Sequence, residues 1–156
     1  MSLFENSEYR WRETCFVLFD GSARPQLQQV QAKLNGQFEL GDSTANEQGE
    51  LETLTVYSPH DFSAMDIHYV DGDDVTETME NLLSDLKQDD LDDHELAKLA
   101  DIANCNARLD VLHFERVMEP VGEDEFLDPG SLLLVLEELA QICRGTGVDP
   151  QSGTIL

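Results

Sequence analysis

The alternation of apolar and polar residues along the chain predicts four β-strands. The first is dense in aromatic and β-branched residues (WRETCFVLF) and ends at Asp20-Gly21, a pair that forms turns. The other three alternate with a period of two, as strands with one buried face do. The strands are predicted at residues 11–19, 51–57, 64–70 and 108–115. Turn residues at 58–61 join the second strand to the third, so we predict a hairpin there.

Apolar residues at helical spacing predict three helical regions. The first follows Ser22, a candidate N-cap, and stops at Gly36. The second is interrupted by the acidic run 89–93 and is predicted either as one helix or as two pieces. The third is the most apolar and is stopped by Gly145. The three regions are 22–36, 75–103 and 132–143.

The length of 156 residues and the 40% share of hydrophobic residues are typical of one domain. We predict a single α+β domain over 1–156, with a polar leader (1–10), a charged linker (119–128) and a tail (148–156) that fits a small hairpin or an edge strand. The segment 37–50 fits a short strand or an open loop. The order of elements matches the ferredoxin-like split βαβ plan (β-α-β-β-α-β) with an added C-terminal helix and short tail. This match is one of topology, and such a fold supports many unrelated functions.

Acidic residues dominate the charge of the chain. Thirty-three Asp and Glu against nine Lys and Arg give a net charge of −24 at pH 7. Such a surface repels phosphate groups, so we expect neither a nucleic acid nor an anionic membrane as a partner. Two interpretations of the acidity stay open. It is either an adaptation to saline surroundings, where salt screens self-repulsion, or a binding surface for a basic protein.

Several features favour the cell interior. The longest apolar run, Leu132 to Leu136, is far shorter than the roughly 20 residues needed to cross a bilayer. Residues 1–11 are polar and charged and do not resemble a secretory signal. The cysteines are odd in number and widely spaced, which favours free thiols over a disulfide framework. They are Cys15, Cys105 and Cys143. We therefore expect a cytoplasmic protein.

The sequence lacks the spacing signatures of common catalytic and cofactor sites. Gly145-Thr146-Gly147 follows a helix rather than opening one, so it does not predict a phosphate loop. A calcium loop starting at Asp71 fails at its sixth and twelfth positions, Thr76 and Leu82. The histidines and cysteines lack the close pairs of a zinc site, and no GxSxG nucleophile turn occurs. We expect no cofactor and no metal, and a role without catalysis is favoured.

One polar cluster is a candidate ligand site. Asp66 and His68 fall on the same face of the third strand because side chains alternate along a strand. Thr53, Thr55 and Tyr57 lie near them if the hairpin register allows. This cluster has the groups needed for ligand binding or acid–base chemistry. The simpler interpretation is the ordinary polar side of a sheet.

Two segments are apolar on more sides than one neighbour can cover. The first strand has apolar residues on both faces, and the last helix has leucines outside its main apolar stripe. Either the first two helices cover one face of the sheet and the last helix covers the other, or the additional residues join an interface such as a homodimer. The candidate interaction residues are Phe16, Leu18, Leu133 and Leu134.

These observations together predict a non-catalytic, acidic protein-interaction module. Its partner is a protein, and the partner is basic if the acidity serves binding. The alternative is a small-molecule binding protein or an enzyme that uses the open sheet face around Asp66 and His68.

Overall fold

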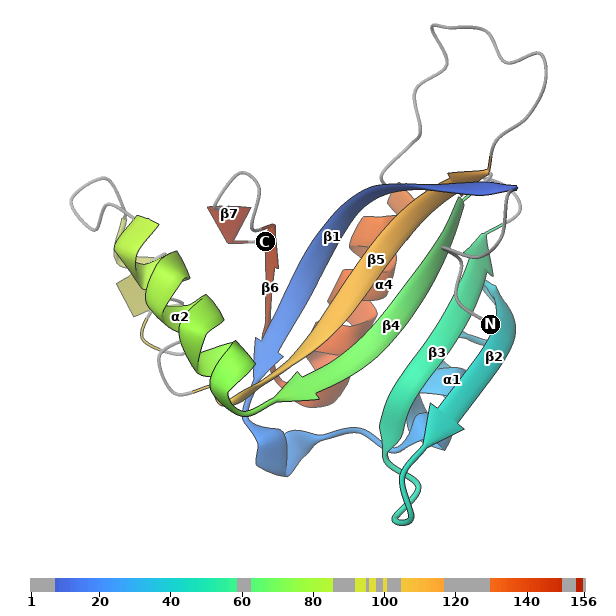
Figure 1. Ribbon diagram of the computed structural model, residues 1–156, viewed down its shortest axis with the longest axis horizontal. Coiled ribbons are helices and arrows are strands. Elements are labelled where there is room, and N and C mark those ends of the chain that lie inside the picture. The colour runs from blue at the N-terminus through green and yellow to red at the C-terminus, as the bar shows by residue number, and fades with distance from the viewer. Residues whose placement is uncertain are drawn as a thin grey trace, which may run out of the picture.

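The computed structural model describes residues 8–58, 63–85, 92–94, 96–97, 100, 105–116, 130–149 and 154–155. Its centre is a curved seven-stranded sheet in which neighbouring strands run antiparallel (Figure 1). The order across the sheet is β2-β3-β4-β5-β1-β6-β7. The strands are β1 (Tyr9–Phe19), β2 (Glu39–Ala45), β3 (Leu51–Ser58), β4 (Ser63–Asp71), β5 (Ala107–Arg116), β6 (Thr146–Asp149) and β7 (Thr154–Ile155).

Two helices lie together behind the sheet in the view of Figure 1. These are α1 (Leu27–Leu34) and α4 (Gly130–Cys143), and Lys33 Nζ of α1 is 3.2 Å from Glu138 Oε2 of α4. A third helix, α2 (Asp73–Asp85), follows β4 and lies at one side of the sheet (Figure 1). A short 3-10 helix, η2 (Gly21–Ala23), follows β1. No helix in the described residues is both long enough and apolar enough to span a membrane.

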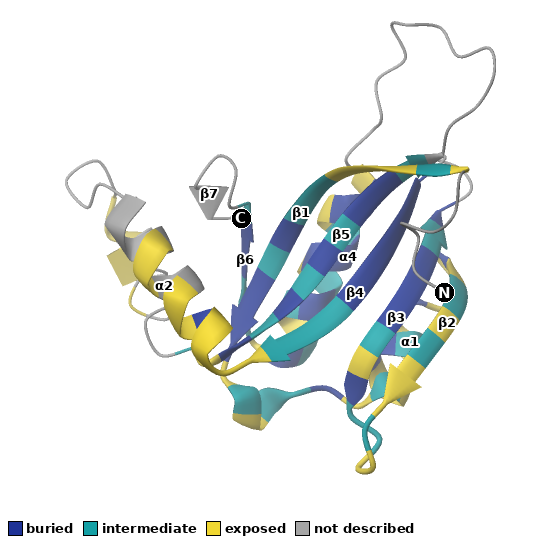
Figure 2. Cartoon of the chain, viewed as in Figure 1, coloured by how far each residue is buried: buried dark blue, intermediate teal, exposed yellow. Residues whose placement is uncertain are grey.

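The main core lies between the sheet and the two helices α1 and α4. The side chains that α4 buries are Ser131, Leu132, Val135, Leu136, Leu139 and Cys143. Alternate residues of β1, namely Cys15, Val17 and Phe19, belong to the same core. Burying one such leucine stabilises the fold by about 1.5–3 kcal/mol relative to leaving it exposed. The predicted apolar stripe of the last helix is confirmed. Burial alternates along most of β5, whereas β4 is buried over its first five residues (Figure 2).

The outer face of the sheet is the face opposite α1 and α4, and it carries two smaller apolar clusters. One is formed by Leu18, Val75 and Val148, and the other by Ala64 and Phe114. Because Val75 belongs to α2, this helix covers part of the outer face, whereas α1 shares the opposite face with α4. The arrangement with α1 and α2 on one face and the last helix on the other is therefore wrong. Both apolar faces of β1 are covered by the same chain: Val17 packs in the main core, and Leu18 packs in the cluster with Val75 and Val148.

The α+β class is confirmed, but the ferredoxin-like strand order is not. A split βαβ unit has parallel strands before and after its helix, with one strand between them. The strands before and after α1 are β1 and β2, and three strands, β3, β4 and β5, lie between them in the sheet. The predicted hairpin of β3 and β4 is confirmed. The undecided segment 37–50 contains β2, which pairs with β3 at the edge of the sheet.

Several element ends differ from the prediction. α1 begins at Leu27, and Ser22 lies in η2, where its backbone N–H donates to Asp20. The second piece of the region 75–103 is described in part, with helical residues at 93–94, 96–97 and 100. The linker 119–128 lies outside the described residues. The leader supplies Tyr9 and Arg10 to β1, and the tail supplies 148–149 to β6 and 154–155 to β7.

The end of α4 is formed by an arginine in a conformation that favours glycine. Arg144 has a φ of 55°, in the left-handed region where a side chain costs about 1–2 kcal/mol. The Gly145 N–H donates to the Ala140 carbonyl at 2.9 Å, as in a Schellman motif. Gly145 follows the helix as predicted, but it is needed for close packing. A Cβ there would lie 2.5 Å from the Leu18 carbonyl oxygen.

Candidate functional site

The register of β3 and β4 brings the predicted ligand residues together on the outer face. Thr53 lies opposite His68, Thr55 lies opposite Asp66, and Tyr57 lies opposite Ala64. Residues directly opposite in an antiparallel pair place their side chains on the same face of the sheet. The predicted residues are therefore neighbours on this face of the sheet.

The carboxylate of Asp66 is already engaged within the protein. Asp66 is 4% exposed, and its Oδ1 accepts a hydrogen bond of 2.6 Å from Thr55 Oγ1, which is itself buried. A buried carboxylate needs such donors because it has lost its water. On the next row of the face, the Oγ1 atoms of Thr44 and Thr53 are 2.7 Å apart. These contacts support the interpretation of the cluster as a polar side of the sheet with internal hydrogen bonds.

Strand β5 extends this polar surface with two residues that the sequence reasoning missed. Asp110 lies opposite His68, and Arg108 Nε donates to Asp110 Oδ1 at 2.7 Å. Burial raises the pKa of the Asp110 carboxyl, while the charges of Arg108 and His68 oppose this rise. Only the pairing of β4 with β5, which local sequence patterns do not reveal, places Asp110 beside His68. The imidazole of His68, the carboxyl of Asp110 and the guanidinium of Arg108, which lies opposite Val70, can exchange hydrogen bonds with a polar ligand.

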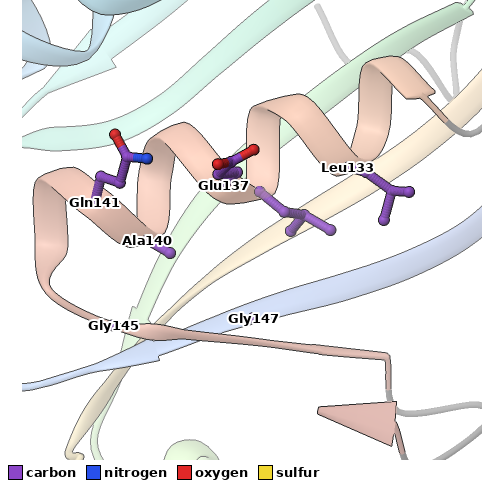
Figure 3. A pocket seen from close by; sticks show the side chains of 7 residues that line it. Leu133, Glu137, Ala140, Gln141, Gly145 and Gly147 are labelled. Carbon is purple, nitrogen blue, oxygen red and sulfur yellow. The ribbon is translucent and has the colours of Figure 1, made fainter. Parts of the chain in front are cut away.

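A hollow of about 430 Å³ lies elsewhere, between α4 and β6 (Figure 3). We call it the α4–β6 hollow. Its described lining residues are Leu133, Leu136, Glu137, Ala140, Gln141, Gly145 and Gly147. Gly147 of β6 and Gly145 just before this strand carry no side chain, and Leu133 on the helix is 47% exposed. A second hollow, of about 550 Å³, lies between α1 and α4, and its lining includes Gln29 and Lys33. Neither hollow is lined by the predicted ligand residues.

The four candidate interaction residues do not form one surface. Leu18 is fully buried on the outer face, and Phe16 is half-buried with the Arg108 guanidinium 4.8 Å above its ring. Leu134 is half-buried against the main core on the other side of the sheet. Leu133 alone of the four is exposed, and it lines the α4–β6 hollow.

A buried histidine on the core side of β5 has unsatisfied ring nitrogens. His113 is 1% exposed, and neither Nδ1 nor Nε2 has a hydrogen-bond partner. The Glu13 carboxylate approaches Nδ1 to 3.6 Å, which is beyond hydrogen-bond reach. Burial lowers the pKa of His113, although the nearby Glu13 charge opposes the shift. The alternating pattern of 108–115 places His113 on an apolar face but does not reveal its missing partners.

The cysteines have the features of structural thiols. All three lie in the described part of the chain, and none of them forms a disulfide. Burial raises the pKa of Cys15 and of Cys143 to about 12, so both stay protonated near neutral pH. Among the described residues, no three His, Cys, Asp or Glu side chains are grouped so that they could hold a metal ion.

The sequence and the fold were compared with protein-family models, curated proteins and solved structures, and no match was found. The function proposed below therefore rests on the charge, the fold and the surface of this chain.

Proposed function

We propose that this protein is an acidic interaction module that binds a basic protein and has no catalytic role. The observation that carries the proposal is the way in which the fold uses its few cations. The chain has nine Lys and Arg against 33 Asp and Glu, and most of the described cations are held by partners within the molecule. The excess of carboxylates, which gives the net charge of −24, makes the surface presented to other molecules negative.

The paired cations lie in three places on the sheet and helices. Arg10 and Arg12 both bind the carboxylate of Glu115. Burial raises the pKa of Glu115, but hydrogen bonds and charge from these two arginines outweigh it and hold the pKa below its ordinary value. Arg108 binds Asp110 and Lys33 binds Glu138. These ion pairs leave the net charge of −24 unchanged, but they fix the cations to carboxylates of the same molecule, so the sign of the remaining surface is set by the carboxylates outside the pairs.

A fifth cation, Arg24, is held within the molecule by stacking on an aromatic ring. The Arg24 guanidinium lies 3.6 Å from the centroid of the Tyr69 ring, and its Nη2 donates to the Leu51 carbonyl at 2.9 Å. A guanidinium held over an aromatic face keeps its charge but loses freedom to meet a partner.

The carboxylates, by contrast, are presented outward, most densely on α2. Asp73, Asp74, Glu77 and Glu80 are exposed on this helix, whereas Val75 is buried (Figure 2). A surface of one sign attracts a partner of opposite sign and raises the association rate by about 10- to 1000-fold, depending on ionic strength. This electrostatic effect is the physical basis of the proposed binding.

The test is affinity capture from an extract of the cells that make the protein, at low and at moderate salt. We expect a dominant basic protein that is lost as salt rises. A variant with Glu39, Glu52, Glu77 and Glu80 changed to Gln should capture markedly less of it. The control carries four conservative changes at exposed neutral positions, namely Gln28→Asn, Gln37→Asn, Gln48→Asn and Thr76→Ser.

Two results would contradict the proposal. One is the recovery of no basic protein at either salt concentration. The other is equal capture by the charge-reduced variant and by the control, because binding would then not depend on the acidic surface.

A further inference from the structure

We infer that the α4–β6 hollow is the place where the basic partner inserts an apolar side chain. This inference rests on the proposed function, since it assigns a contact site to the same interaction. The acidic surface supplies long-range attraction, whereas the hollow supplies a short-range apolar contact that salt does not screen.

The lining of the hollow suits an apolar side chain. Leu133 and Leu136 provide apolar walls, and Gly145 and Gly147 add no side chain to fill the space. Figure 3 shows Leu133 and Ala140 extending from α4 on the side of β6, while Gln141 extends on the other side of the helix. Leu133 is one of three large apolar residues that are exposed in the described part of the chain, with Trp11 and Leu96. Covering a solvent-exposed leucine with an apolar group lowers the free energy, because apolar surface is removed from water.

The charge at the rim of the hollow indicates that the partner has basic residues on either side of the inserted apolar side chain. Glu137 is exposed and lines the hollow, and no Lys or Arg occurs among its described lining residues. A cationic flank therefore meets a carboxylate at the rim, while an acidic flank would meet like charge. A second copy of this chain fits poorly, because α4 against α4 would bring two Glu137 side chains together and join two molecules of charge −24.

The experiment uses three fluorescein-labelled peptides with the whole protein at low salt. The first alternates Lys and Gly around a central Leu, the second has Ser in place of that Leu, and the third has Glu in place of each Lys. We expect the Lys/Leu peptide to bind about tenfold more tightly than its Ser twin, as burial of most of one leucine side chain implies. The Glu/Leu peptide should not bind measurably.

The matched variants are Leu133→Asn and Leu96→Asn. Both positions are exposed, Leu133 at 47% and Leu96 at 38%, so both variants should fold, and thermal unfolding of each variant tests this. Leu133→Asn should abolish the advantage of Leu over Ser in the peptide, and Leu96→Asn should preserve it. With ¹³C-labelled methyl groups, the Lys/Leu peptide should shift the signals of Leu133 and Ala140 and leave Leu96 unchanged.

The outcomes separate this inference from the proposed function. If both Lys peptides bind equally well, or if Leu133→Asn keeps the preference for Leu, the hollow is not the contact site, although the acidic surface still binds. If neither Lys peptide binds at low salt, the proposed function itself is contradicted. If the wild type sediments as a dimer and Leu133→Asn as a monomer, a second copy occupies the hollow and the inference is wrong.

Discussion

His113 is a base placed where its charged form is poorly tolerated. Its ring is buried on the core side of β5, and its two nitrogens have no hydrogen-bond partner, although the Glu13 carboxylate lies 3.6 Å from Nδ1. The charged groups that face it are Glu13 and Arg12 from β1 and Glu115 from its own strand, and Met65 lies opposite it on β4. Burial lowers the pKa of His113 in the folded chain, so the unfolded chain takes up a proton first as the pH falls.

The stability of the protein should therefore depend on pH through His113. The contribution of His113 to the free energy of unfolding is fully present above the ordinary histidine pKa of about 6.5. It is lost as the pH falls toward the lower pKa that His113 has in the folded chain, by at most about 1.4 kcal/mol per pH unit. Urea unfolding of the wild type and of His113→Gln between about pH 8 and about pH 5 measures this loss. The variant should lose less stability than the wild type over this range. Equal losses would mean that His113 is not the group that titrates.

The candidate ligand residues show how far sequence reasoning reaches at this scale. Alternation along one strand is enough to place Asp66 and His68 on the same face, because the period of two is a local property. The neighbours on β5 follow from strand order, which is set by packing across the whole sheet. Asp110 and Arg108 could be assigned to this surface only once β4 was seen to pair with β5.

Among the elements, α4 has the least usual ending. Its left-handed residue is Arg144, and the following Gly145 is fixed by the close approach of β1. The sequence predicted the correct stop because glycine is common just after helices. It could not assign the separate roles of the two residues, since these depend on the position of the Leu18 carbonyl oxygen.

This ending predicts a difference between two variants at one position. Arg144→Gly should be more stable than Arg144→Ala by about 1 kcal/mol, because glycine adopts a positive φ without steric cost and both variants lack the guanidinium. The free energies of unfolding in urea provide the measurement. Gly145→Ala should instead be destabilising, since its Cβ would meet the Leu18 carbonyl oxygen at 2.5 Å. Equal stability of the two Arg144 variants would contradict the left-handed assignment.

The strands were easier to predict than their arrangement. Clear alternation predicts β3, β4 and β5, whereas Gly41, Asp42 and Ser43 give β2 no apolar period, so its sequence fits a strand or a loop equally well. It forms by pairing with β3 along the edge, with irregular register at two points. Pairing of this kind follows from the position of a neighbour and is invisible in the segment itself.

At the scale of the whole molecule, the net charge of −24 should make stability depend on salt. Between about 0.01 M and about 1 M NaCl the Debye length falls from about 30 Å to about 3 Å, so repulsion between exposed carboxylates is screened. We expect the free energy of unfolding in urea to rise over this range. The variant with Gln at positions 39, 52, 77 and 80 should be more stable than the wild type at low salt and should gain less from added salt.

A flat salt response would contradict this view of the surface. It would mean that the carboxylates are spaced widely enough to avoid strong repulsion. A steep rise joined with failure to capture any basic protein would favour adaptation to saline surroundings over binding.

The central position of β1 also governs when the protein can fold. β1 lies between β5 and β6, and Arg10 and its partner Glu115 are 105 positions apart in the chain. Contacts of such long range slow folding because a large loop must close before they form. During synthesis, β2, β3 and β4 can pair as soon as they emerge. β1 must wait for residues 107–116, and until then both of its apolar faces are uncovered. β1 thus leaves the ribosome before both of its neighbours, β5 and β6, and in that interval its exposed apolar residues and unpaired edges favour aggregation.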